Sequence, residues 1–253
     1  MANDMKAIFF FAHQDDEFGV LSSIEQHVFD NDDVYCIYVT DGAQTALPKI
    51  RNLESLSVLS RLGVKERNVI FLGQELQFKD GELHKKIIEL IGWLDEFFQT
   101  NSDIGFCYFP ALEGGHPDHD ILHTATVVSL EKIDKVSAGL QYPLYNSWKM
   151  PRPFFKVLSP LPHNGPADER FLTLKQKFRY FSFCFYYRSQ WKTWVGLAPF
   201  VFFHLFFHSR YYLQEASLNR LFKRPHDGPL YFESRKFLSW HEFLEAANLI
   251  VRR

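Results

Sequence analysis

Short apolar runs alternate with helical patterns through residues 1–150, and no other feature limits the fold of this chain as strongly. Each run is continuous and rich in aromatic or β-branched residues, which is typical of a buried strand. The runs are residues 6–12, 34–40, 69–72, 104–110 and 140–145. Between them, apolar residues recur at helical spacing in residues 18–29, 50–63, 82–99 and 120–133. This order predicts parallel strands joined by right-handed crossovers, and therefore an α/β fold: a doubly wound, mostly parallel sheet with helices on both faces.

Polar clusters follow three of the predicted strands. AHQDDE (12–17) follows the first strand, TDG (40–42) the second and PALEGGHPDHD (110–120) the fourth. In open α/β sheets, ligands bind beyond the carboxyl ends of the strands. We therefore expect the histidine and aspartate side chains of these clusters to meet at one edge of the sheet. They are His13, Asp15, Asp16, His116, Asp118 and His119.

Two imidazoles and one carboxylate are typical ligands of zinc, with a fourth position left for water. Because His13 and Asp16 are three residues apart, they can converge on one ion, which leaves Asp15 beside it to take a proton from the bound water. A further histidine can stabilise an oxyanion or protonate a leaving nitrogen. The cluster predicts a metal-assisted hydrolase. The structural alternative is that Asp15 or Asp16 caps the following helix and that residues 116–119 form a solvated loop.

AHQDDE and HPDHD resemble the two signature motifs of the LmbE-like (PIG-L) family of zinc-dependent N-deacetylases, whose first motif commonly reads AHPDDE. The TDG segment, the R-x-x-E helix with Arg51 and Glu54, the FLG segment (71–73) and a later SQ pair (189–190) are also similar to this family. The resemblance implies that the zinc ligands are His13, Asp16 and His119. It implies three catalytic roles: Asp15 as the general base, His116 as the group that stabilises the tetrahedral intermediate and helps protonate the amine, and Asp118 as the acid that orients His116.

The resemblance also implies the reaction and the cofactor, Zn²⁺. The expected activity is removal of an N-acetyl group from an N-acetylglucosamine-type sugar in a glycoconjugate or in a cell-envelope or secondary-metabolite precursor. One alternative is an amidohydrolase of the same mechanism acting on a non-sugar amide. Another class is a non-catalytic metal- or nucleotide-binding module. The nucleotide alternative is disfavoured because acids, and no G-x-G-x-x-G motif, follow the first strand.

Three positions depart from the family pattern. Gln14 replaces the usual proline, Gly114 stands where some members have a tyrosine, and residues 71–76 (FLGQEL) do not carry, at the usual fixed offset, the acid that often follows FLG. Arg51 is a candidate contact for a substrate phosphate or hydroxyl, and a surface ion pair with Glu54 is the alternative.

The C-terminal part differs in composition from the rest. Residues 180–213 are dense in aromatic side chains, but the least polar piece, 194–207, contains Pro199 and is shorter than the roughly 20 residues that a membrane-spanning helix needs. We expect residues 1–150 to form a Rossmann-like, metal-dependent deacetylase domain and residues 151–253 to form a C-terminal cap packed on it. The alternative for the aromatic segment is a peripheral contact with a lipid-linked substrate.

Charge and cysteine usage limit the partners and the compartment. Residues 1–150 carry 12 Lys+Arg and 23 Asp+Glu, whereas residues 151–253 carry 16 and 7, and the whole chain has a formal net charge of −2. We expect a small N-acetylated sugar or glycoconjugate as partner and no nucleic acid, with a homo-oligomer left open. The three separated cysteines and the absence of a signal-peptide pattern predict a cytoplasmic protein without disulfides.

Overall fold

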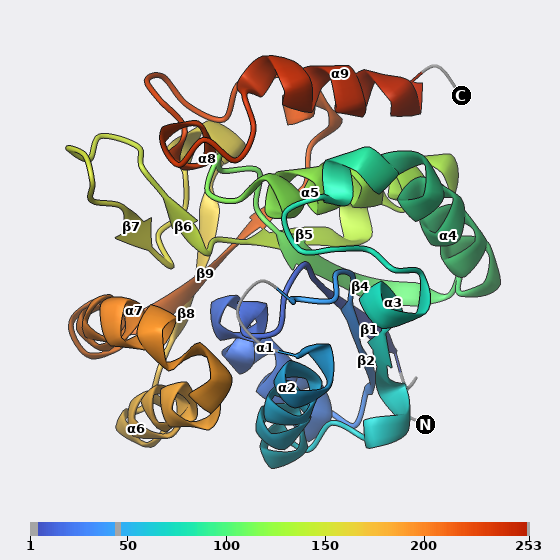
Figure 1. Cartoon of the computed structure of the whole chain (residues 1–253). Coiled ribbons are helices and arrows are strands. Elements are labelled where there is room, and N and C mark those ends of the chain that lie inside the picture. Colours follow the sequence, from blue (N-terminus) through green and yellow to red (C-terminus); the bar gives the residue numbers. More distant parts are fainter. Residues whose placement is uncertain (1–4, 44–46, 252–253) are drawn as a thin grey trace.

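The computed structural model describes residues 5–43 and 47–251. Its central feature is a seven-stranded sheet with the strand order β3-β2-β1-β4-β5-β9-β8 (Figure 1). The strands are β1 (Lys6–Phe11), β2 (Asp33–Tyr38), β3 (Val69–Phe71), β4 (Ile104–Pro110), β5 (Gly139–Tyr142), β8 (Ala167–Phe171) and β9 (Arg210–Glu215). The first five pair in parallel, and β9 and β8 extend the sheet in antiparallel pairing. The mostly parallel α/β fold predicted from the sequence is confirmed.

Helices cover both faces of this sheet (Figure 1). The buried side chains of α4, α5 and α9 share one apolar core, and those of α1, α2, α6 and α7 share the other. The helices are α1 (Leu21–Phe29), α2 (Pro48–Leu62), α3 (Leu72–Glu75), α4 (Ile87–Thr100), α5 (Pro117–Lys132), α6 (Leu174–Phe183), α7 (Trp191–Phe203), α8 (Tyr231–Ser234) and α9 (Trp240–Val251). A small second sheet pairs β6 (Tyr145–Asn146) with β7 (Lys156–Val157). In the described part of the chain, no helix combines the length and apolarity required to cross a bilayer.

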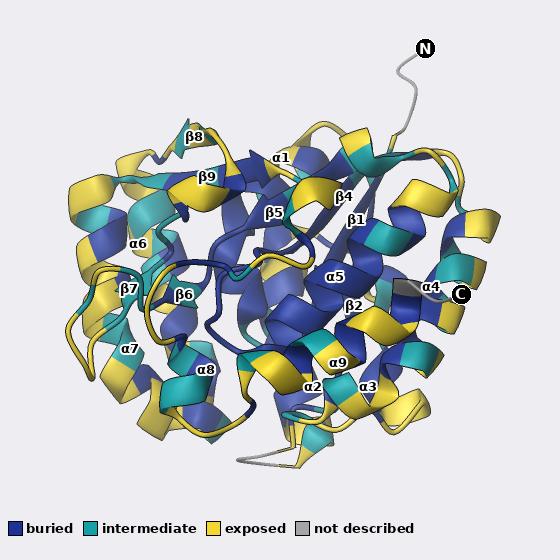
Figure 2. Cartoon of the chain, turned by 90° about the horizontal axis from the view of Figure 1, so that it is seen from above, coloured by how far each residue is buried: buried dark blue, intermediate teal, exposed yellow. Residues whose placement is uncertain are grey.

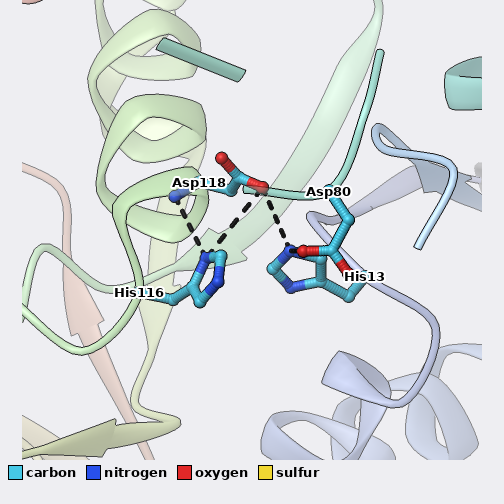
Figure 3. Close-up of side chains that lie close together, drawn as sticks. All are labelled: His13, Asp80, His116 and Asp118. Carbon is cyan, nitrogen blue, oxygen red and sulfur yellow. Dashed lines mark hydrogen bonds and ion pairs between the residues drawn. The ribbon is translucent and has the colours of Figure 1, made fainter. Parts of the chain in front are cut away.

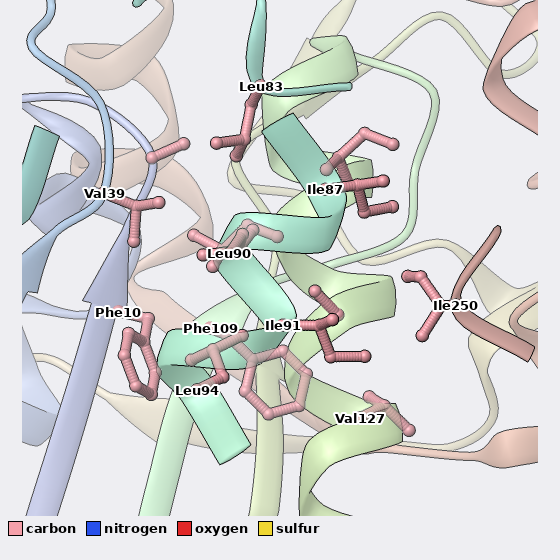
Figure 4. Close-up of a cluster of buried hydrophobic side chains, with 14 of the residues drawn as sticks. Phe10, Val39, Leu83, Ile87, Leu90, Ile91, Leu94, Phe109, Val127 and Ile250 are labelled. Carbon is pink, nitrogen blue, oxygen red and sulfur yellow. The ribbon is translucent and has the colours of Figure 1, made fainter. Parts of the chain in front are cut away.

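Strand β1 shows why an uninterrupted apolar run predicts a strand in the middle of such a sheet. Successive side chains of a strand point to opposite faces. Ile8 and Phe10 enter the core beneath α4 and α5, whereas Phe9 and Phe11 enter the other core. Figure 4 shows Phe10 among the leucine side chains of α4 and next to Phe109 of β4. Both faces of β1 are therefore buried, and polar alternation is excluded.

The sheet order places the two signature segments beside each other. Strands β1 and β4 are parallel neighbours, with Phe9 opposite Tyr108, so the chain leaves both strands at the same edge of the sheet. The AHQDDE segment continues from β1, and the segment that leads to α5 continues from β4.

The predicted single helix over residues 82–99 is split in two. A 3-10 turn, Leu83–Lys86, precedes α4. The Leu83 N–H, which has no partner within a helix that starts there, donates to Oδ1 of Asp118 at 3.1 Å and ties this turn to the second signature segment.

Candidate active site

The AHQDDE segment turns sharply where β1 ends. The His13 N–H donates to Oδ2 of Asp16 at 2.8 Å, and the Asp15 N–H donates to Oε2 of Glu17 at 2.9 Å. Asp15 has φ 111° and ψ −11°, a left-handed conformation that costs a non-glycine residue about 1–3 kcal/mol. It stands at the N-cap of the 3-10 helix Asp16–Gly19, but its side chain forms no capping hydrogen bond within the described residues. Helix capping therefore does not account for Asp15.

The second signature segment forms the start of α5. His116 is the N-cap residue, and Pro117 occupies the first helical position, where its missing N–H is not needed. Asp118 and Asp120 lie in the first turn, where the helix dipole favours negative charge. Residues 116–119 are buried, so the alternative of a solvated loop is not what the structure shows.

His13, Asp16 and His119 bring three ligand-type atoms together. Nδ1 of His13 lies 3.2 Å from Nε2 of His119, and this Nε2 atom lies 3.1 Å from Oδ1 of Asp16. Oδ2 of Asp16 lies 3.7 Å from Nδ1 of His13. A tetrahedral ion with bonds of about 2.0–2.1 Å separates its ligands by about 3.3 Å. The spacing of these three donors fits a divalent cation.

The electrostatics of this group also favour a cation. All three side chains are buried. Burial alone would raise the pKa of Asp16, but the adjacent imidazoles of His119 and His13 hold its pKa well below the usual value. Asp16 is therefore ionised, as a metal ligand must be.

The second ring nitrogen of His13 faces two further carboxylates. Nε2 of His13 lies 3.2 Å from Oδ1 of Asp80 and 3.2 Å from Oδ2 of Asp118 (Figure 3). Burial lowers the pKa of His13, but Asp80 and its other acidic neighbours outweigh this effect and raise that pKa above the usual value. A carboxylate on the far nitrogen of a ligating histidine fixes the ring and increases its basicity. Asp80 and Asp118 thus orient Nδ1 of His13 toward Asp16 and His119.

Asp118 makes its closest side-chain contact with His13, whereas the sequence prediction assigned it to His116. Its Oδ2 atom is 4.0 Å from Nδ1 of His116, and it also accepts the Gly81 N–H at 2.6 Å. Nδ1 of His116 instead accepts the backbone N–H of Asp118 at 3.3 Å (Figure 3). Burial and the neighbouring His13 lower the pKa of His116 to about 3. His116 is therefore a neutral imidazole whose proton is on Nε2.

Arg51 is a buried part of the site. Its guanidinium donates to the carbonyl oxygen of Gln14 at 2.7 Å and to that of Gly42, and it lies 3.5 Å from Oδ2 of Asp80. The alternative of a surface ion pair with Glu54 is wrong, because Glu54 accepts the N–H and the hydroxyl of Ser189 instead. Arg51 holds the TDG and AHQDDE segments together.

A cavity of about 570 Å³ opens onto these residues. This volume lies in the range of small-molecule sites. The signature segments supply the polar end of the cavity, and the C-terminal part supplies most of the other wall. That wall includes Lys192, Thr193 and Phe200 of α7, Tyr231 of α8 and Arg235.

Asp15 faces this cavity next to the three ligand-type residues. Its Oδ1 atom lies 3.8 Å from Nη2 of Arg51. Burial raises the pKa of Asp15 well above the usual value, although Arg51 opposes the shift. The raised pKa makes the carboxylate a better proton acceptor than an exposed aspartate.

Sequence reasoning missed Asp80. The family pattern places an acid shortly after the FLG segment, within residues 71–76. The acid that contacts His13 is Asp80, which follows α3 in the FKDGEL stretch (78–83). The Asp80-Gly81 pair, a turn signal placed just before the apolar positions of the next helix, was the available signal. Sequence reasoning also missed that Gln190, from the C-terminal part, donates to the carbonyl oxygen of Gln14 at 2.9 Å.

One protein-family model matches the N-terminal part of the chain. Residues 8–130 match the family model described as PIG-L, GlcNAc-PI de-N-acetylase. This match includes both signature segments and ends within α5. No curated protein sequence matches the chain.

Several solved structures are similar to this one. The A40926 pseudoaglycone deacetylase has a TM-score of 0.60 at 17% identity, covering 85% of this chain and 98% of that protein. A triple mutant of a deacetylase of the teicoplanin biosynthetic pathway has a TM-score of 0.62 at 17% identity, covering 83% and 96%. N,N'-diacetylchitobiose deacetylase from Pyrococcus horikoshii has a TM-score of 0.52 at 16% identity, covering 85% of each chain. At these identities the similarity shows a shared fold.

Proposed function

The chain belongs to the PIG-L (LmbE-like) family through residues 8–130, and we propose that it is a zinc-dependent hydrolase that removes the N-acetyl group from an N-acetylglucosamine-type sugar. The observation that carries the proposal is the convergence of His13, Asp16 and His119, with 3.1 to 3.7 Å between their ligand atoms, beside Asp15 in one cavity. The proposed catalytic domain is residues 1–150, with residues 151–253 as an extension packed on it.

His13, Asp16 and His119 would hold the ion. A bound Zn²⁺ would supply Lewis acidity at the amide carbonyl and lower the pKa of water at the site. The imidazole nitrogens and the carboxylate are the ligand types that zinc prefers, and three protein ligands leave room for substrate or water. In this assignment Asp80 and Asp118 position His13 and do not bind the ion.

Asp15 acts on the attacking water. Its carboxylate takes one proton while the water oxygen bonds to the acetyl carbon. The amide C–N bond then breaks, and the proton held by Asp15 is passed to the departing nitrogen. The second proton of the water leaves the carboxyl group for the amine or for solvent, so the products are acetate and the protonated amine, and atoms and charge balance.

His116 acts on the oxygen of the acetyl group. Because its Nδ1 accepts a backbone hydrogen bond, its Nε2 carries the proton and is free to donate. A neutral donor of this kind stabilises the negative charge that develops on the carbonyl oxygen. It also lies close enough to the cluster to assist proton transfer to nitrogen, since its ring centroid is 4.6 Å from that of His13.

The walls of the cavity support a sugar substrate. Tyr145, Phe155, Phe200, Tyr231 and Phe237 line it together with the charged side chains of Arg51, Lys192 and Arg235. Aromatic rings suit the apolar faces of a pyranose, and the charged groups suit its hydroxyls or an anionic substituent. Teicoplanin-pathway and diacetylchitobiose deacetylases share the fold, which also supports this substrate class.

The test is release of acetate and free amine from a panel of N-acetylglucosamine conjugates. The protein is stripped with a chelator and then reloaded with Zn²⁺, and the Asp15→Asn variant serves as the inactive control. Activity that depends on added metal and disappears in the variant supports the proposal. If the panel yields no amine while simple non-sugar acetamides are cleaved, the alternative amidohydrolase is correct.

A further inference from the structure

We propose that the outer surface of α6 and α7 docks this protein on an anionic lipid bilayer. We call this surface the apolar face. It continues beyond α7 into the π-helix His204–His208. Its members are large apolar side chains that solvent reaches: Phe178, Phe185, Trp191, Val195, Phe202, Phe203 and Phe207. The docking is argued from the surface itself and does not depend on the reaction.

The exposure of these side chains is too large for an ordinary soluble surface. Phe178 is 60% exposed, Phe185 68%, Trp191 60% and Phe207 68%. Since an aromatic residue has about 150–250 Å² of surface, the apolar face exposes on the order of 800 Å², above the roughly 300–600 Å² of the largest patch on a typical monomer. Figure 2 shows exposed segments along both α6 and α7. The C-terminal part was predicted to be a packed cap, but its outer surface also carries exposed aromatic side chains.

Five phenylalanine rings form a connected row across α6, α7 and the π-helix. Phe178 of α6 contacts Phe206 at a centroid distance of 5.0 Å, and Phe181 contacts Phe202 of α7 at 5.2 Å. Phe202 and Phe206 stack at 4.5 Å. Phe181 and Phe185 continue the row at 5.9 Å. These contacts hold the exposed rings of Phe178, Phe185 and Phe202 in place, so this part of the surface is preformed.

Helix α7 has the pattern of a helix that lies along a bilayer surface. Trp194 and Val201 face the protein core, whereas Trp191, Val195 and Phe202 recur on the outer side at helical spacing. With 13 residues the helix is about 20 Å long, too short to span the hydrocarbon region. An apolar outer side with tryptophan and flanking cations is typical of interfacial binding.

The charged residues of the segment that carries the apolar face all have one sign. Residues 171–214 contain no Asp or Glu and six Lys or Arg residues. Lys175, Arg188 and Lys192 are exposed and form no ion pair with any residue that the structure describes. Each such cation near an anionic membrane adds about 1 kcal/mol of attraction. The apolar face thus offers the two kinds of contact that a negatively charged bilayer provides.

The same charges disfavour a second copy of the chain as the occupant. A symmetric dimer presents the same patch on both subunits. The cations of one apolar face would then lie against those of the other without acids from residues 171–214 to neutralise them. Nearby acids on other elements are already engaged: Glu25 pairs with Arg179 and Glu169 with Arg210, and Glu54 accepts the N–H and the hydroxyl of Ser189.

Docking would also place the active-site cavity near the lipid surface. Helix α7 belongs to both features, because Lys192, Thr193 and Phe200 line the cavity while Trp191 and Val195 lie on the apolar face. The apolar face is thus continuous with the wall of the cavity.

The experiment is vesicle flotation with the full chain. One set of vesicles is phosphatidylcholine, and the other is an equal mixture of phosphatidylcholine and phosphatidylglycerol. The variants are Phe185→Ser with Trp191→Ser, which removes exposed rings, and Lys175→Glu with Arg188→Glu, which reverses charge. Leu249→Ser is the matched control, since Leu249 is exposed and belongs to α9, which packs on the other face of the sheet from α6 and α7 (Figure 1).

We expect the wild type and Leu249→Ser to float with the mixed vesicles and more weakly with the neutral ones. Loss of two rings should weaken binding about tenfold or more, and charge reversal should remove the preference for phosphatidylglycerol. The proposal is overturned if the wild type floats with neither vesicle or if the ring variant floats as well as the wild type. A salt-resistant dimer in light scattering that these substitutions dissociate, without vesicle binding, would assign the face to self-association. The vesicles contain no substrate, so neither result bears on the proposed hydrolase activity.

Discussion

Nε2 of His13 lies 3.2 Å from the carboxylate of Asp80, which joins the turn after β1 to the loop after α3. Asp80 is largely buried, and the facing imidazole of His13 outweighs burial to hold its pKa well below the usual value. We expect Asp80→Asn to leave the fold intact and to weaken zinc binding about 10–100-fold, as loss of a carboxylate behind a ligating histidine typically does. Competition against a chromophoric chelator measures this affinity. Asp95→Asn, which alters a partly exposed contact with Lys132, should bind zinc normally, and equal affinity in both variants would remove Asp80 from the site.

Asp15→Asn separates catalysis from metal binding. Asp15 is next to the three proposed ligands but is not one of them, so zinc content by mass spectrometry should stay at the wild-type value. Acetate release should fall about 10²–10⁴-fold, the contribution of a positioned general base. An active Asp15→Asn variant would show that another group takes the proton.

His119→Ala tests the ligand set. The substitution removes the nitrogen that lies between His13 and Asp16, and we expect stoichiometric zinc binding to be lost together with activity. Circular dichroism checks that the helices remain. Unchanged zinc content would mean that the ion binds elsewhere, for example among His13, Asp80, His116 and Asp118.

His123 makes the fold sensitive to acid. Its ring lies 3.0 Å from the Pro110 carbonyl oxygen, and burial lowers the pKa of His123 to about 4. The unfolded pKa is about 6.5, so the neutral ring contributes stability above that pH and loses it as the pH falls toward 4. The loss is about 3 kcal/mol over this window. Urea unfolding at several pH values should show that His123→Leu removes this part of the pH dependence; parallel curves for the two proteins would contradict the assignment.

Tyr187, from the C-terminal part, supports the turn formed by the AHQDDE segment. Its hydroxyl donates to the buried carboxylate of Glu17, whose other oxygen accepts the Asp15 N–H. Tyr187→Phe leaves that carboxylate short of a donor, and we expect the free energy of unfolding to fall by about 1–3 kcal/mol. Tyr186→Phe is the control, because that ring lies nearer the surface beside Arg61. Equal unfolding free energies in the two variants would show that the hydrogen bond between Tyr187 and Glu17 does not stabilise the fold.

The sequence predicted the sheet and the two signature segments because each rests on local pattern. Buried parallel strands have continuous apolar sequences, and the alternation of strands with helices predicts their parallel pairing. Asp80 was not predictable in this way, because its position depends on tertiary contacts. One of them is the close approach of Gly73, where an added Cβ would meet the backbone of Thr40. Strands β8 and β9 were missed because they carry polar residues and pair only with β5 and each other. The sequence pattern of residues 180–213 also did not predict which aromatic side chains pack in the core and which are exposed.

The antiparallel pairing of β9 with β5 has a practical consequence for shortened forms of the protein. A fragment that stopped near residue 150 would retain every signature residue, yet β5 would present an open row of backbone donors and acceptors on one side. Such an edge is a template for association with other chains. We therefore expect the N-terminal piece to precipitate when it is produced alone and to regain solubility when the missing half is supplied as a separate polypeptide.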